Sequence, residues 1–214
     1  KLLWTKQATA DDVFNMGADA LRMFSRENAF FAKLMPSVGK VQRELLDYAL
    51  FLQNAPQQAE AAITSGGTES VFSACLAARE YFFAKRGSSG TPQILAPRTI
   101  HPAFHKAAHI LRMEVVCSDI DSNFKAIPSL IEQSITENTA MIAGSAPGYP
   151  HGIFDPVAEL SELAAKHDIW CHVDACVGGY LSPFVERLGR PIPVHDFRLP
   201  GVWSMSADLH KHGY

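Results

Sequence analysis

The residues with the clearest chemical potential stand at the end of the chain, where Lys211 lies between His210 and His212. Apolar residues precede them, so the sequence predicts a short buried strand over 202–205 that runs into a polar turn. A lysine becomes a nucleophile, able to form a Schiff base, when desolvation or neighbouring cations lower its pKa. Most loop lysines are simply solvated, so this interpretation depends on the residues that join Lys211.

A glycine pair, Gly66 and Gly67, is followed by Thr68 at the start of a predicted helix that closes at Lys85-Arg86-Gly87. Glycines let the backbone approach an anion closely, and the N–H groups of a first helical turn bind phosphate. Such a pair is more often a plain turn. The stretch is neither a Walker loop nor a Rossmann fingerprint.

An acidic residue, Asp174, ends an apolar strand predicted over 169–173. A carboxylate in such a place is costly unless a cation pairs with it. A protonated pyridine nitrogen would be such a partner and would make a cofactor ring an electron sink. The alternative is an aspartate that caps the following turn.

Three histidines, His101, His105 and His109, are spaced four apart and would share one helix face. We predict no metal here, because the stretch lacks an H-E-x-x-H motif and an acidic third ligand. His101 follows a strand and could stack on an aromatic cofactor. His105 and His109 are interpreted as helix-surface residues.

The composition indicates a globular protein, with 47% hydrophobic and 19% charged residues in 214. The net charge of −3 and the lack of a basic run give no reason to expect a nucleic-acid partner. No apolar stretch is long enough to span a membrane, and no signal peptide is apparent. Four cysteines without paired spacing indicate reduced thiols, so we expect a cytoplasmic protein.

The order of elements predicts an α/β fold. Residues 1–56 form an N-terminal helical segment, with one amphipathic helix beginning after Thr9 and a second over 38–52. From residue 57 onward, strands alternate with helices, which predicts a mainly parallel sheet covered by helices on both faces. The expected strands are 93–96, 113–117, 139–144, 169–173 and 202–205; the expected helices are 69–86, 102–112, 127–136 and 156–167, the last capped by Asp155.

Polar residues follow these strands at the edge where ligands bind in parallel sheets, beyond the carboxyl ends of the strands. They are His101, Ser145, Asp174 and the stretch 208–211. This agreement between topology and chemistry is the strongest indication of a functional site.

Five motifs in order resemble the group II pyridoxal-phosphate-dependent decarboxylases, and within that group they are most similar to the sphingosine-1-phosphate lyases. They are Thr64–Ser70, His101–Phe104, Gly144–Pro147, His172–Gly179 and Ser206–Tyr214. The resemblance implies a fold-type-I large domain that binds pyridoxal 5'-phosphate and acts on a small-molecule amine as a homodimer. It makes Lys211 the Schiff-base lysine, Asp174 the partner of the pyridine nitrogen and His101 the ring-stacking residue. Gly67 and Thr68 would bind the phosphate, with His210, Ser145 and Ser206 close to the cofactor.

Two departures from the family pattern are visible. Asn28, which would face the substrate, is kept, but Phe31 stands where the lyases carry a histidine. The sequence also stops three residues after Lys211, which predicts a large domain truncated before a C-terminal small domain. Three hypotheses follow: a carbon–carbon lyase that cleaves a phosphorylated sphingoid base or a similar amino alcohol, an amino-acid decarboxylase, or a non-catalytic fragment.

Overall fold

The computed structural model describes residues 11–27, 35–87 and 90–213. The chain divides into two compact units, residues 1–48 and 49–214. The first contains α1 (Asp11–Phe24), which opens with two acidic residues at its positive end, and most of α2 (Pro36–Leu52). Thr9, Asn28 and Phe31 lie outside the described residues. The expected domain boundary at 56/57 stays a prediction.

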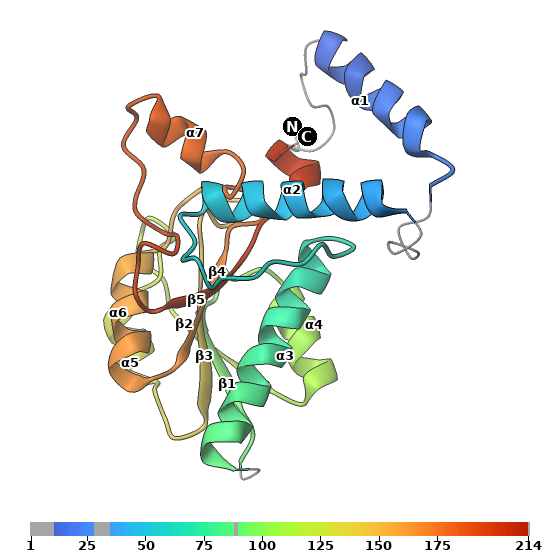
Figure 1. The fold of residues 1–214 in the computed structure, drawn as a ribbon. Helices are drawn as coiled ribbons and strands as arrows, with labels where there is room; N and C mark the ends of the chain where they lie inside the picture. Colours follow the sequence, from blue (N-terminus) through green and yellow to red (C-terminus); the bar gives the residue numbers. More distant parts are fainter. Residues whose placement is uncertain (1–10, 28–34, 88–89, 214) are drawn as a thin grey trace. The chain divides into compact units, whose positions relative to one another are not determined.

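The second unit is built on a sheet of five strands in the order β2-β1-β3-β4-β5, and every pair of neighbours is parallel (Figure 1). The central strand is buried along its whole length, as expected for a sheet covered on both faces. The predicted α/β class is therefore confirmed. The strands are β1 (Gln93–Pro97), β2 (Glu114–Ser118), β3 (Thr139–Ser145), β4 (Trp170–Asp174) and β5 (Val202–Ser206).

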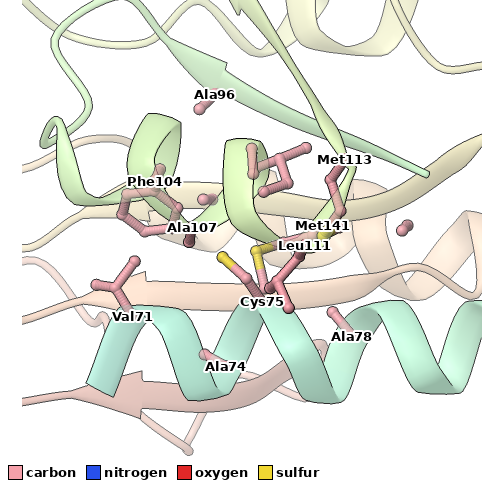
Figure 2. Packing of buried hydrophobic residues seen from close by; sticks show 14 of the residues in the cluster. Val71, Ala74, Cys75, Ala78, Ala96, Phe104, Ala107, Leu111, Met113 and Met141 are labelled. Atoms are coloured by element: carbon pink, nitrogen blue, oxygen red, sulfur yellow. The ribbon is translucent and has the colours of Figure 1, made fainter. Parts of the chain in front are cut away.

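Helices cover the two faces of this sheet. In Figure 1, α3 (Gly67–Arg86) and α4 (Ala103–Leu111) lie on one side, while α5 (Pro128–Gln133) and α6 (Val157–His167) lie on the other. One apolar cluster fills the α3/α4 side, and Figure 2 shows small residues of α3 against larger ones of α4 and the strands. A second cluster fills the α6 side. No helix in the described part of the chain has both the length and the apolar character to cross a membrane.

Two local expectations were wrong, and two further features were not foreseen. Asp155 does not cap α6; its carboxylate instead accepts hydrogen bonds from the backbone N–H groups of Ala126 and Ser145, both at 2.8 Å. The helix expected to reach residue 136 ends at Gln133. A short helix, α7 (Ser182–Arg187), was not predicted. The expected polar turn around Lys211 is a π-helical turn, Leu209–Gly213.

Candidate active site

A cavity of about 340 Å³ lies beyond the carboxyl ends of the strands. Its walls come from the N-terminus of α3, from His101 in the loop between β1 and α4, and from the loops after β3, β4 and β5. The structure thus brings together stretches that are far apart in sequence. The lining residues that the sequence had predicted as functional are Gly67, Thr68, His101, Asp174, His210 and Lys211.

The N-terminus of α3 forms one wall of this cavity. Gly66 has a φ of 147°, a conformation that favours glycine, and it turns the chain into the helix. A Cβ on Gly67 would lie 2.7 Å from Asp208 Oδ2 and 2.8 Å from Cys176 Sγ, so a larger residue there would displace these two side chains. The first-turn N–H groups of a helix have no intrahelical acceptor, which makes this wall suited to an anion.

Asp174 contributes a carboxylate, suited to a cation, at the end of β4, where the residue is 7% exposed. Its Oδ1 accepts hydrogen bonds from Cys176 N at 3.1 Å and from Ser206 Oγ at 3.5 Å. Burial raises the pKa of the Cys176 thiol, so the neighbour of Asp174 is a neutral thiol. The carboxylate is held in place with its charge available to a cationic group.

Lys211 is brought to the cavity by the π-helical turn and pairs with Asp208. The Nζ atom lies 2.9 Å from Asp208 Oδ2, and the side chains are 17% and 4% exposed. His210 Nε2 lies 3.4 Å from the same carboxylate oxygen. Asp208 was not assigned a role from the sequence. Its spacing three residues before Lys211 was the available signal, because residues three apart share a face of a helical turn.

His101 is oriented by the start of α4. Its Nδ1 accepts a hydrogen bond from Ala103 N at 3.1 Å, so a neutral ring carries its proton on Nε2. The ring of His101 therefore lines the cavity with a defined orientation and tautomer.

Two predicted site residues of the described ranges, Ser206 and Ser145, do not line the cavity. Ser206 is buried behind Asp174, with which it shares a hydrogen bond. Ser145 is also buried, and its N–H donates to Asp155 rather than toward the cavity. Asn28 falls outside the described residues. Within the described ranges, no group of three side chains is arranged to hold a metal ion.

The cavity combines an anion-binding helix terminus, a buried carboxylate and a lysine. A ligand that satisfies all three carries an anionic group, a ring nitrogen that can be protonated and a carbonyl carbon. Pyridoxal phosphate has these three features, and the donor set of the cavity fits it. The fold and site together define a domain of the pyridoxal-phosphate-dependent class.

Comparison with known families agrees with this class. The family model described as the pyridoxal-dependent decarboxylase conserved domain matches residues 4–214. The chain therefore belongs to the pyridoxal-dependent decarboxylase family, as the motifs had predicted.

Among individual relatives, sphingosine-1-phosphate lyases are prominent. The lyase of Dictyostelium discoideum is 42% identical over 197 residues, which is 92% of this chain and 37% of the relative. The mouse sphingosine-1-phosphate lyase 1 is 40% identical over 89% of this chain and 34% of its own length. The chain thus spans about a third of the length of these curated relatives.

Superposition on solved structures agrees with these sequence comparisons. The sphingosine-1-phosphate lyase of Burkholderia pseudomallei superposes with a TM-score of 0.88 at 39% identity, covering 96% of this chain and 49% of that one. A glutamate decarboxylase from Lactobacillus brevis superposes with a TM-score of 0.83 over 99% of this chain and 50% of its own. At 21% identity, this second likeness supports the fold alone.

Proposed function

We propose that the full-length protein is a pyridoxal-phosphate-dependent carbon–carbon lyase that cleaves a phosphorylated sphingoid base or a similar amino alcohol. The observation that carries this proposal is the identity of 40% and 42% to sphingosine-1-phosphate lyases over about nine-tenths of the chain. A decarboxylase of the same fold reaches only 21%.

Six of the lining residues have a role in this proposal. The N–H groups of Gly67 and Thr68, at the start of α3, would bind the cofactor phosphate. Lys211 would be the residue that holds the cofactor at its carbonyl carbon, and Asp208 Oδ2, 2.9 Å from Lys211 Nζ, keeps this side chain at the cavity wall. His101 would stack on the cofactor ring, and the hydrogen bond that its Nδ1 accepts from Ala103 N orients the imidazole.

Asp174 would pair with the ring nitrogen and favour its protonated form. When bound, pyridoxal phosphate supplies a cationic ring that accepts the electron pair left as a bond to the amine-bearing carbon breaks. For an amino alcohol, the broken bond joins that carbon to the hydroxyl-bearing carbon. The hydroxyl loses its proton and its carbon becomes an aldehyde, while the amine-bearing carbon gains a proton.

The substrate assignment is tested by product analysis on the full-length protein supplied with pyridoxal phosphate. Sphingosine 1-phosphate should give a long-chain aldehyde and phosphoethanolamine in equal amounts, and the Lys211→Ala variant should give neither. Release of carbon dioxide from glutamate or an aromatic amino acid, without aldehyde from the sphingoid base, would assign the protein to the decarboxylases instead.

We also propose a cytoplasmic location and a homodimeric assembly. The location is supported by the four cysteines, none of which forms a disulfide. Burial raises the pKa of Cys75 and Cys171 to about 12, so these two remain neutral thiols in the core. Size-exclusion chromatography with light scattering on the full-length protein tests the dimer.

A further inference from the structure

A chain of buried polar side chains runs along the two strands behind the cavity. The register of β4 and β5 places His172 opposite Ser204 and Asp174 opposite Ser206. Residues two apart on a strand point to the same face, so all four side chains share one face of the sheet. His172 is completely buried, and its ring meets the edge of Phe104 at a centroid distance of 5.8 Å.

Hydrogen bonds connect these side chains in one line. Trp170 Nε1 lies 2.7 Å from Ser204 Oγ, which lies 2.8 Å from His172 Nδ1. On the other side of the ring, His172 Nε2 lies 3.3 Å from Ser206 Oγ, which lies 3.5 Å from Asp174 Oδ1. We call these five residues the Trp170–Asp174 relay.

The direction of every hydrogen bond in the relay is fixed by its ends. An indole N–H only donates, and an ionised carboxylate only accepts. At the other end, Ser206 gives its single proton to Asp174, so His172 Nε2 donates to Ser206, and a neutral ring then accepts at Nδ1 the proton of Ser204, whose oxygen accepts from Trp170. The ring then carries its proton on Nε2 and donates it to Ser206 Oγ.

The Ser206 hydroxyl group makes the last hydrogen bond of the relay, to Asp174. Its oxygen accepts from His172 Nε2 and also from Cys176 Sγ at 3.3 Å, which uses both of its lone pairs. The remaining Ser206 proton points to Asp174 Oδ1. All donors thus point toward the carboxylate, and hydrogen bonds aligned in one direction strengthen each other.

The relay requires a neutral imidazole, because a charged ring would donate from both nitrogens. Burial lowers the pKa of His172 to about 4, and the nearby Asp174 charge opposes this only in part. The other titratable group in contact with the relay is Cys176, whose pKa burial raises, so it stays a neutral donor.

We infer that His172 is a positioning residue that acts through Ser206 to orient the Asp174 carboxylate toward the ring nitrogen of pyridoxal phosphate. This inference rests on the proposed function. His172 is fully buried and does not line the cavity; it acts by holding the side on which Asp174 presents its second oxygen, Oδ2.

The first test needs no cofactor. Nitrogen-15 NMR of histidine-labelled full-length protein, with the His172 signals assigned by their loss in His172→Phe, should show Nε2 protonated and Nδ1 bare down to about pH 4. A proton on Nδ1, or a charged ring at pH 6, would overturn the inference whatever the protein does with pyridoxal phosphate.

The second test measures affinity for pyridoxal phosphate. His172→Phe and Ser206→Ala should each weaken binding about tenfold, and His172→Gln, which keeps a donor and an acceptor, should restore most of the loss. Ser161→Ala is the matched control: this buried serine accepts from Gly201 N at 2.9 Å, outside the relay, so its variant should bind within twofold of wild type.

The two proposals fail in different ways. If borohydride reduction fixes pyridoxal phosphate on Lys211 in wild type but His172→Phe and Ser206→Ala bind it as tightly as Ser161→Ala does, the relay is refuted and the cofactor site stands. If wild type takes up no pyridoxal phosphate, the proposed function fails. The NMR measurement of the His172 tautomer still decides whether the hydrogen bonds of the relay have the proposed direction.

Discussion

The fully buried imidazole of His172 should make the protein sensitive to mild acid. Its pKa falls from an ordinary value of 6.5 to about 4 on folding, because burial disfavours the charged ring. As the pH drops, the unfolded chain therefore binds the proton first. The stability that His172 contributes is complete above pH 6.5 and is lost progressively as the pH falls toward 4.

The size of the loss follows from the same values. Each pH unit of difference between the folded and unfolded pKa corresponds to about 1.4 kcal/mol. Between 6.5 and about 4, wild type should lose about 3 kcal/mol of unfolding free energy relative to His172→Gln, which cannot take up the proton. This is a large share of the stability of an ordinary domain.

The assay is urea unfolding of the full-length protein without cofactor at several pH values from 7.5 to 4, for wild type and His172→Gln. Only the difference between the two matters, because other titrating groups are common to both. Ser161→Ala serves as a control, since its difference from wild type should not change with pH. A wild-type-minus-Gln difference that stays constant from pH 6.5 to 4 would refute a neutral buried His172.

Three further predictions concern the cavity and its support. Gly67→Ala should weaken pyridoxal phosphate binding at least tenfold by equilibrium titration, because the new Cβ would lie 2.7 Å from Asp208; Gly17→Ala, with nothing within 4 Å, should leave it unchanged. Asp208→Ala should lower the unfolding free energy of the cofactor-free protein by about 2 kcal/mol, because it removes the 4% exposed carboxylate of a partly buried ion pair; no loss in urea unfolding would contradict this. Asp155→Asn should lower the unfolding free energy by about 1–3 kcal/mol in the same assay, since an amide has one acceptor oxygen for the two N–H donors that now lie at 2.8 Å. A variant that unfolds at the same urea concentration as wild type would contradict this.

Much of the sheet and of the cavity lining could be predicted from the sequence, for identifiable reasons. The strands are apolar and separated by helices with clear periodicity, and parallel strands place their carboxyl ends at one edge. It could therefore be predicted, without knowing the strand order, that Lys211, Asp174 and His101 lie at one cavity. Gly67 and Thr68 are adjacent in the sequence, so predicting their place in the cavity required only the position at which α3 begins.

Other features depend on contacts that the sequence does not display. The relay exists because a register shift between Cys171 and His172 sets His172 opposite Ser204, and pairing irregularities leave no signature in one strand alone. Asp155 was assigned as a helix cap because its position before Pro156 fits one. Its carboxylate instead accepts hydrogen bonds from the backbone N–H groups of Ala126, just before α5, and Ser145, at the end of β3. The short α7 has only six residues, too few to show a helical period.

The role of Lys211 is tested most directly by incubating the full-length protein with pyridoxal phosphate, reducing it with borohydride and mapping the adduct by peptide mass spectrometry. We predict a single cofactor adduct on Lys211, absent in Lys211→Arg. A folded protein that carries no adduct, or carries it on another lysine while Lys211→Arg retains it, would contradict the assignment of this cavity as a pyridoxal-phosphate site.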